Sequence, residues 1–205
     1  MPEVGGVDVS RETIQALEEF TGLLTKWNRS INLVAKSTIA DIWQRHIVDS
    51  AQILTWETQN RQNWLDIGSG GGLPGMIVSI ILHELDPSAI VTLVESDQRK
   101  AAFLRSAATA LNLNAKIKAQ RVEALLPANA NVLSARALTS LNGLFDSGER
   151  HLLPDGCLLL LKGRTYADEI AEARKTWHFD VVTRPSMTDN EAKMLMIRNL
   201  ERANA

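Results

Sequence analysis

Cysteine is almost absent from this chain, which has one, Cys157, in 205 residues. A single cysteine can form neither an internal disulfide nor a cysteine-based metal cluster. The four histidines are His46, His83, His151 and His178. They lack the short spacings of metal-ligand pairs, so no metal site is expected. Cys157 opens an apolar run that we predict to be a buried strand, and a lone free thiol fits a reducing cytoplasm.

Long apolar runs, strong charge and aromatic residues are also scarce. No run approaches the ~20 residues that span a bilayer. Met1–Val9 has neither the basic start nor the apolar core of an export signal, so a cytoplasmic protein without a membrane segment is expected. The formal net charge of -2 excludes a strongly basic protein, but it leaves room for a local basic face. With 5% aromatic residues, extensive stacking on nucleic-acid bases is not expected.

The chain has enough apolar sequence for one globular unit. Of its 205 residues, 45% are hydrophobic, which suffices for a single well-formed core. No apolar helix face obviously requires a second copy, so we expect a monomer.

Residues 10–56 are predicted to be mostly helical. Apolar residues recur at helical spacing between Ile14 and Trp27, and Ser10 suits the N-cap position before them. Thr38 and Asp41 match a capping box at the start of a second apolar stretch.

Residues 1–9 read as a loose tail, and the polar stretch 57–63 marks a join. We therefore expect an N-terminal helical extension over residues 1–60, packed on a core domain over residues 61–205. The two would form a single structural unit.

From Trp64 onward, strand-like and helix-like segments alternate. Strands are expected at 64–67, 90–94, 116–120, 131–135, 157–162, 179–184 and 194–199. Helices are expected near 75–84, 97–112, 139–151 and 166–177. This alternation predicts an α/β fold with a mostly parallel seven-stranded sheet covered by helices on both faces. Only a polar loop, 185–193, separates the last two strands, so they are expected to pair antiparallel at an edge.

The stretch 64–75, Trp-Leu-Asp-Ile-Gly-Ser-Gly-Gly-Gly-Leu-Pro-Gly, is typical of a strand, a glycine loop and a helix start that cradle a nucleotide. Pro74 suits the first helical position. A P-loop is excluded because Met76 and Ile77 follow Gly75 where lysine and a hydroxyl residue are needed. A dinucleotide fingerprint is disfavoured because Leu73 replaces its third glycine.

Carboxylates at two strand ends favour a nucleoside ligand. Asp66 lies near the end of the first strand of this unit and Glu95 follows the second. A carboxylate at the position of Glu95 can accept hydrogen bonds from both hydroxyls of a ribose. No group is evident that must bind a pyrophosphate, so S-adenosylmethionine, a nucleoside with a cationic centre, fits this loop. The alternative is a tight turn in an α/β protein that binds nothing.

The next two strand ends belong to the same edge of the sheet. Arg121-Val122-Glu123 follows the third strand, where backbone groups and a carboxylate can bind an adenine edge. Glu123 can equally be an acid that favours a helix start. Ser134-Ala135-Arg136-Ala137 ends the fourth strand.

With these residues identified, the chain resembles the bacterial 16S ribosomal RNA guanine-N7 methyltransferases, a family also called glucose-inhibited division protein B. The resemblance covers almost the whole chain. It is carried by the glycine loop and by residues 26–33, 45–50, 121–123, 134–137 and 161–163. The segment Arg45-His46-Ile47-Val48-Asp49-Ser50 and the Gly-Leu-Pro-Gly ending of the loop make it specific. One departure is Val34, where the family pattern has threonine.

The resemblance implies a Rossmann-like class I S-adenosylmethionine-dependent methyltransferase fold and assigns site residues. Gly68, Gly70 and Leu73 would hold the methionyl part of S-adenosylmethionine. Glu95 would bind its ribose, and Val122 and Glu123 its adenine. Arg136 would face both the cofactor and the target as a positioning residue. His46 and Lys162 would lie on the catalytic side, although a lone histidine on a helix is as often structural.

Methylation at N7 of guanine needs no general base, because that nitrogen carries a free lone pair at neutral pH. The sequence shows no nucleophile–base motif, in agreement with catalysis by positioning. Three alternatives remain: a methyltransferase for a small molecule or a protein, a nucleotide-binding module without catalysis, and a disfavoured NAD enzyme.

Residues 96–121 form a candidate basic face for RNA. They carry six basic side chains against the single acid Asp97, a net charge of +5. Lys162 and Arg164 follow near the predicted pocket. Such residues attract phosphates in a salt-dependent way, although an ordinary solvated helix face has the same appearance. The expected partner is 16S rRNA or the small ribosomal subunit particle.

Overall fold

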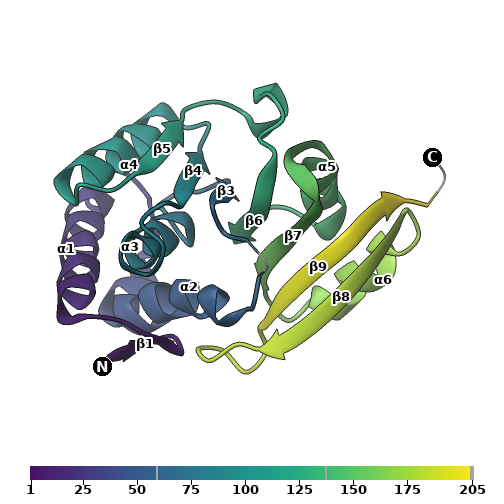
Figure 1. Ribbon diagram of the computed structural model, residues 1–205. Helices are drawn as coiled ribbons and strands as arrows, with labels where there is room; N and C mark the ends of the chain where they lie inside the picture. The colour runs from purple at the N-terminus through teal and green to yellow at the C-terminus, as the bar shows by residue number, and fades with distance from the viewer. Residues whose placement is uncertain (59, 137, 204–205) are drawn as a thin grey trace.

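A seven-stranded sheet forms the centre of the molecule (Figure 1). This computed structural model describes residues 1–58, 60–136 and 138–203. The strands stand in the order β5-β4-β3-β6-β7-β9-β8. They span Ala115–Lys118 (β5), Ile90–Val94 (β4), Asn63–Ile67 (β3), Ala130–Arg136 (β6), Leu152–Lys162 (β7), Lys193–Arg202 (β9) and Trp177–Pro185 (β8).

The pairing confirms the predicted mixed sheet. The neighbouring strands β5, β4, β3, β6 and β7 run parallel to one another. Strand β9 pairs antiparallel with both β7 and β8. The antiparallel pair at the edge is as expected, with β9 inserted between β7 and β8.

Helices cover both faces of the sheet (Figure 1). On one face lie α1 (Arg11–Asn28), α3 (Gly75–Leu85) and α4 (Gln98–Ala110), and on the other lie α5 (Leu141–His151) and α6 (Tyr166–Ala173). Side chains alternate along β3, so Trp64 packs with the first group and Leu65 and Ile67 pack with the second.

The N-terminal residues are ordered, and the prediction of a loose tail is wrong. Strands β1 (Glu3–Val4) and β2 (Val7–Asp8) form a hairpin. Gly5 and Gly6 supply its turn with φ angles of 59° and 81°. Val4 and Val9 are buried in the core, so apolar burial stabilises a segment too short to show a strand pattern in the sequence.

Ser10 caps α1 as predicted, since its hydroxyl accepts a hydrogen bond from the N–H of Thr13 at 3.1 Å. The capping box of Thr38 and Asp41 is wrong. Residues 36–55 form short 3₁₀, π and α turns, among them α2 (Asp49–Ala51), and Thr38 lies inside the first of them. Its hydroxyl bonds instead to the Ala35 carbonyl at 2.8 Å and to the His46 ring at 2.7 Å.

Two helix ends differ from the predictions. Helix α3 begins at Gly75, so Pro74 is its N-cap residue rather than its first residue. Helix α6 ends at Ala173 because Trp177 is recruited into β8, where it pairs with Arg202 and is buried. Helix α1 packs against α3 and α4, and the N-terminal segments therefore share one core with the sheet. A domain boundary near residue 60 stays a prediction.

Candidate active site

The glycine loop leaves the carboxyl end of β3 and leads into α3. Gly68 and Gly70 have φ angles of 62° and 54°, a left-handed conformation that favours glycine. At Gly75, a Cβ would lie 2.6 Å from Oδ2 of Asp66, so only glycine lets α3 begin directly against the end of β3. The glycines therefore allow a backbone conformation and a close approach that other residues would prevent.

Glu95 follows β4 and binds this loop from the neighbouring strand. Its Oε2 accepts a hydrogen bond from the N–H of Gly70 at 2.8 Å, and its Oε1 accepts one from the N–H of Asp97 at 2.7 Å. A carboxylate offers about four acceptor sites. The oxygens of Glu95 can thus accept further donors while they hold the loop.

A cavity of about 810 Å³, which we call the glycine-loop cavity, opens beside Glu95. Its lining includes most of the predicted cofactor residues, namely Gly68, Gly70, Glu95, Val122 and Glu123. Leu73 is buried in the core, 5% exposed, and does not line this cavity. The structure thus brings together three strand ends that the sequence placed at one edge of the sheet.

Helix α5 fixes the turn that carries Val122 and Glu123. His151 donates a hydrogen bond to the Val122 carbonyl at 3.2 Å, and the guanidinium of Arg150 donates to the Leu125 carbonyl at 3.0 Å. Burial lowers the pKa of His151, which favours the neutral ring in this contact. Sequence reasoning missed both residues, because no local pattern marks a contact that spans 29 positions.

A second cavity, of about 560 Å³, is lined by Arg136, and we call it the Arg136 cavity. His46 and Lys162, the other residues predicted for the catalytic side, line it as well. Arg136 is absent from the lining of the glycine-loop cavity. Leu138 and Thr139 line both cavities, so they form a shared wall. Ala137, which belongs to the predicted motif, lies outside the described residues.

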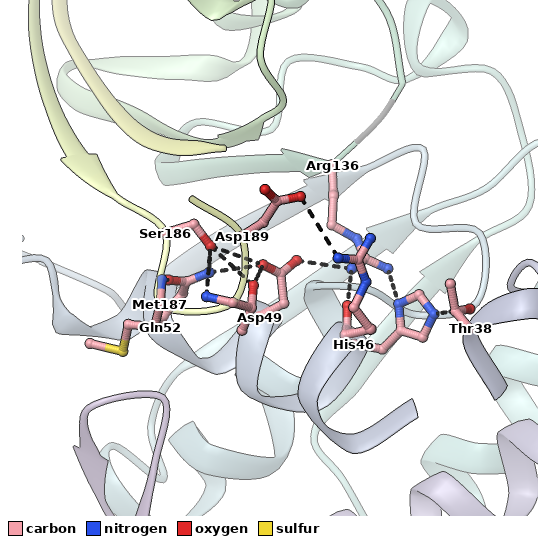
Figure 2. A network of polar contacts seen from close by, with 10 residues as sticks. Thr38, His46, Asp49, Gln52, Arg136, Ser186, Met187 and Asp189 are labelled. Atoms are coloured by element: carbon pink, nitrogen blue, oxygen red, sulfur yellow. Dashed lines mark hydrogen bonds and ion pairs between the residues drawn. The ribbon is translucent and has the colours of Figure 1, made fainter. Parts of the chain in front are cut away.

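Arg136 belongs to a polar network that joins three segments of the chain through Asp49 (Figure 2). Its guanidinium pairs with Oδ2 of Asp49 at 3.1 Å and contacts Nδ1 of His46 at 3.1 Å. Oδ1 of Asp49 accepts hydrogen bonds from the Thr188 hydroxyl at 2.6 Å and the Gln52 amide at 2.9 Å. The end of β6, the turns around residues 46–52 and the β8–β9 loop are thereby held together.

The hydrogen bonds of His46 determine its tautomer. A guanidinium can only donate, so Nδ1 of His46 accepts from Arg136. Nε2 then carries the proton and donates to the Thr38 hydroxyl, which donates to the Ala35 carbonyl. Burial and the charge of Arg136 lower the pKa of His46 to about 4, so the ring is neutral at physiological pH. Both of its nitrogens are occupied by neighbours.

Asp66 lies fully buried beneath the glycine loop. The Ser134 hydroxyl donates to its Oδ1 at 2.6 Å and accepts a hydrogen bond from the Trp64 indole at 2.8 Å. Burial raises the pKa of Asp66 to about 6, although the bond from Ser134 opposes this shift. The side chain supports the loop from below and does not line either cavity.

Lys162 is buried at the end of β7 and is paired within the protein. Its ammonium lies 2.7 Å from Oε2 of Glu169 and donates to the Thr139 carbonyl at 2.9 Å. Its predicted attraction for phosphates is therefore largely neutralised by Glu169. Burial raises the pKa of the Cys157 thiol to about 11, which makes it an unreactive core residue.

Among residues 1–58, 60–136 and 138–203, no group of three His, Cys, Asp or Glu side chains is arranged to hold a metal ion. Over the same residues, no helix has both the length and the apolarity to cross a membrane.

Solved structures with the same fold are class I methyltransferases. Ribosomal protein L11 methylase from Lactobacillus delbrueckii subsp. bulgaricus superposes with a TM-score of 0.58 at 18% identity, over 75% of this chain and 77% of that one. The tRNA (uracil-54, C5)-methyltransferase of Pyrococcus abyssi, in complex with S-adenosyl-L-homocysteine, gives a TM-score of 0.52 at 12% identity, over 76% of this chain and 38% of that one. These similarities confirm the predicted fold class.

Sequence comparison identifies the family. The model of the family described as rRNA small subunit methyltransferase G matches residues 13–200. The ribosomal RNA small subunit methyltransferase G of Cereibacter sphaeroides is 46% identical over 194 residues, which cover 95% of this chain and 94% of that protein. This chain belongs to the rRNA small subunit methyltransferase G family.

Proposed function

We propose that this protein transfers a methyl group from S-adenosylmethionine to N7 of a guanine in 16S rRNA of the small ribosomal subunit. The observation that carries the proposal is the pair of adjoining cavities, which share the wall of Leu138 and Thr139. Two cavities side by side suit a donor and an acceptor that must meet. Family membership and the family's name support rRNA as the acceptor.

The glycine-loop cavity fits S-adenosylmethionine, the cofactor that supplies a methyl group bound to a sulfonium. Glu95 would accept hydrogen bonds from the ribose hydroxyls while it holds the loop. Val122 and Glu123 would bind the adenine, and the backbone at Gly68 and Gly70 would lie along the methionyl part. Among the described residues, a Cβ at Gly70 would approach the Gly68 carbonyl oxygen alone, at 3.8 Å, so this side of the loop has room for a ligand.

The Arg136 cavity suits an acceptor that loses no proton before it reacts. Its histidine and carboxylates all have partners: His46 accepts from Arg136, Asp49 pairs with Arg136, Glu169 pairs with Lys162, and Asp189 lies 3.7 Å from Arg45. Each of these side chains is therefore already engaged within the protein. Guanine N7 needs no base, and the network would serve to orient the acceptor.

RNA binding would use the basic face of α4 and β5. Arg105, Lys116, Lys118 and Arg121 are exposed there, and Lys100 and Arg121 also line the glycine-loop cavity. We expect the protein to act as a monomer in the cytoplasm, where ribosomal subunits are assembled.

Methyl transfer from labelled S-adenosylmethionine tests the proposal directly. The acceptors to compare are small-subunit particles, naked 16S rRNA, ribosomal proteins and free nucleosides. We expect label in rRNA and strand cleavage at the modified base after borohydride reduction and aniline treatment, a reaction to which 7-methylguanosine is sensitive. Label in protein or small molecules alone would favour those acceptors instead. Cofactor binding without any transfer would favour a nucleotide-binding module, and tight binding of NAD alone would exclude the proposal.

A further inference from the structure

We propose that Lys162 and Glu169 are a positioning pair that holds the wall between the two cavities in place. This role rests on the proposed methyl transfer, because the wall matters most if two ligands react across it. It differs from the role that the sequence suggests for Lys162, which is a phosphate-attracting or catalytic lysine.

The first observation is the way the ammonium of Lys162 is used. It is 8% exposed, lies 2.7 Å from Oε2 of Glu169, and donates to the Thr139 carbonyl at 2.9 Å. A buried ammonium needs a counter-charge and hydrogen-bond acceptors, and these two partners supply them. Lys162 therefore binds the protein's own backbone at the wall.

Glu169 completes the arrangement from α6. Its Oε2 also accepts a hydrogen bond from the N–H of Leu141, the first residue of α5, at 3.1 Å. The Ser140 side chain makes no capping bond to α5, so Glu169 takes over that role. The wall residues Leu138 and Thr139 thus lead directly into a helix start that the same ion pair holds.

The packing of the wall shows why its position matters. A Cβ at Gly68 would clash with the Leu138 side chain, so this leucine rests directly on the glycine loop. The Thr139 side chain lies over Gly143 in α5, where a Cβ would be 2.9 Å away. Thr139 follows Leu138 in the chain, and Lys162 fixes the Thr139 carbonyl. This bond therefore helps to keep Leu138 in place on the loop. A shift of this carbonyl would change the separation of the two cavities.

Three variants test this role: Lys162→Met, Lys162→Arg and Glu169→Gln. The matched control is Lys175→Met, which breaks an exposed lysine–glutamate pair with Glu172 whose residues line neither cavity. Rates are measured per folded enzyme with labelled S-adenosylmethionine and small-subunit particles.

We expect Lys162→Met to lower kcat by roughly 10- to 100-fold, because misplacement of the wall by about 1 Å disturbs the approach of the reactants. The affinity for S-adenosylhomocysteine should change by less than about threefold. Lys162→Arg should recover part of kcat, and Lys175→Met should resemble the wild type. Glu169→Gln should lower kcat in the same way as Lys162→Met.

A phosphate-binding lysine would give the opposite pattern. Glu169→Gln would then free the ammonium and lower the KM for the particles, and Lys162→Met would reduce the salt dependence of RNA binding by about one unit of slope with kcat unchanged. That result would overturn the proposal, as would equal kcat values in all the variants.

Amide hydrogen exchange tests the wall independently of catalysis. The amide of Leu141 should exchange faster in Lys162→Met and Glu169→Gln than in the wild type and in Lys175→Met. If Lys162→Met does not fold, the double variant Lys162→Met/Glu169→Gln, which leaves no unpaired buried charge, is measured in its place. Unchanged exchange would refute the positioning role even if the wild type methylates rRNA. If the Leu141 amide exchanges faster in the variants but the wild type methylates none of the acceptors, the proposed function is refuted. The pair then has a structural role alone.

Discussion

The carboxylate of Glu95 holds two backbone amides, one in the glycine loop and one at the start of α4. These are the N–H groups of Gly70 and Asp97, at 2.8 Å and 2.7 Å. The side chain that would bind the ribose therefore also shapes the loop beside it. The sequence placed Glu95 correctly at a strand end, but the bond to Gly70 depends on β4 lying next to β3.

Glu95→Ala should weaken the binding of S-adenosylmethionine by ~1–3 kcal/mol, because charge-assisted hydrogen bonds to the ribose are lost and the loop loses its support. Calorimetry with the cofactor measures the change. Glu18→Ala, an exposed substitution on α1, is the control and should leave the affinity unaltered. Wild-type affinity in Glu95→Ala would show that the ribose lies elsewhere.

Asp66 illustrates a different use of a carboxyl group. It is buried beneath the loop, and its pKa is raised from 3.8 to about 6. The folded state therefore binds more protons than the unfolded state between these values. The stabilising contribution of this group is complete below pH 3.8 and is lost as the pH rises through about 6.

The substitution Asp66→Asn removes this titration. Relative to the variant, the wild type should lose about 3 kcal/mol of unfolding free energy between about pH 3.5 and pH 7. Urea unfolding of both proteins over this range measures the difference. His46, with its pKa lowered from 6.5 to about 4, acts in the opposite direction and destabilises the fold as the pH falls, but it does so in both proteins. Parallel stability curves would contradict the buried ionisation of Asp66.

At the scale of elements, the turns of residues 36–55 are fixed by contacts made outside them. The sequence predicted mostly helix here, and the apolar spacing supports that interpretation. The observed 3₁₀ and π turns instead place His46, Asp49 and Gln52 where they reach β6 and the β8–β9 loop. Hydrogen bonds to distant segments thus override a local helical preference.

Asp49→Asn should loosen the junction of these three segments. The side chain is only 17% exposed, and loss of its charge weakens bonds to Arg136 and Thr188. We expect a cost of about 1.5–3 kcal/mol in urea unfolding, because these bonds involve a charged acceptor. Faster proteolysis in the β8–β9 loop should accompany it.

Glu172→Gln provides the comparison, since its carboxylate is 61% exposed and pairs with Lys175 on the surface. Exposed pairs contribute ~0–1 kcal/mol, so this variant should remain close to the wild type. Similar losses in the two variants would mean that the Asp49 network adds no more than a surface pair.

At the scale of the whole molecule, several basic residues lie together at the β5 edge of the sheet. Strand β5 is the edge strand, and its side chains alternate, so Ala115 and Ile117 pack inward while Lys116 and Lys118 are exposed. Helix α4 adds Arg105, and Arg121 continues to the glycine-loop cavity. The net charge of -2 for the chain conceals this distribution.

The double substitution Lys116→Ala/Lys118→Ala should weaken binding to 16S rRNA at low salt and lower the slope of log K against log salt by about two units. Binding titrations at several salt concentrations measure the slope. Lys26→Ala/Lys175→Ala removes the same charge from exposed positions elsewhere and should leave the slope unaltered. Equal slopes in the two double variants would exclude the β5 edge as an RNA contact.

The sequence by itself determined the α/β architecture and the glycine loop. It also determined that Glu95, Val122 and Glu123 lie where the parallel strands have their carboxyl ends. These features are local: side-chain periodicity, turn-forming glycines and the alternation of strand and helix can be read within short windows. Because parallel strands align their carboxyl ends, local order was enough to bring together the strand-end residues of the glycine-loop cavity, although not the residues that α5 adds to its lining.

Only the tertiary structure decided the Arg136 cavity and the partners of its side chains. Arg136 meets Asp49 across 87 positions, and Thr188 meets Asp49 across 139. The pairing of Lys162 with Glu169 and Thr139 likewise depends on how α5, α6 and β7 pack. Such partners are selected when buried charges must find counter-charges and hydrogen bonds inside the assembled fold, a condition that no local pattern records.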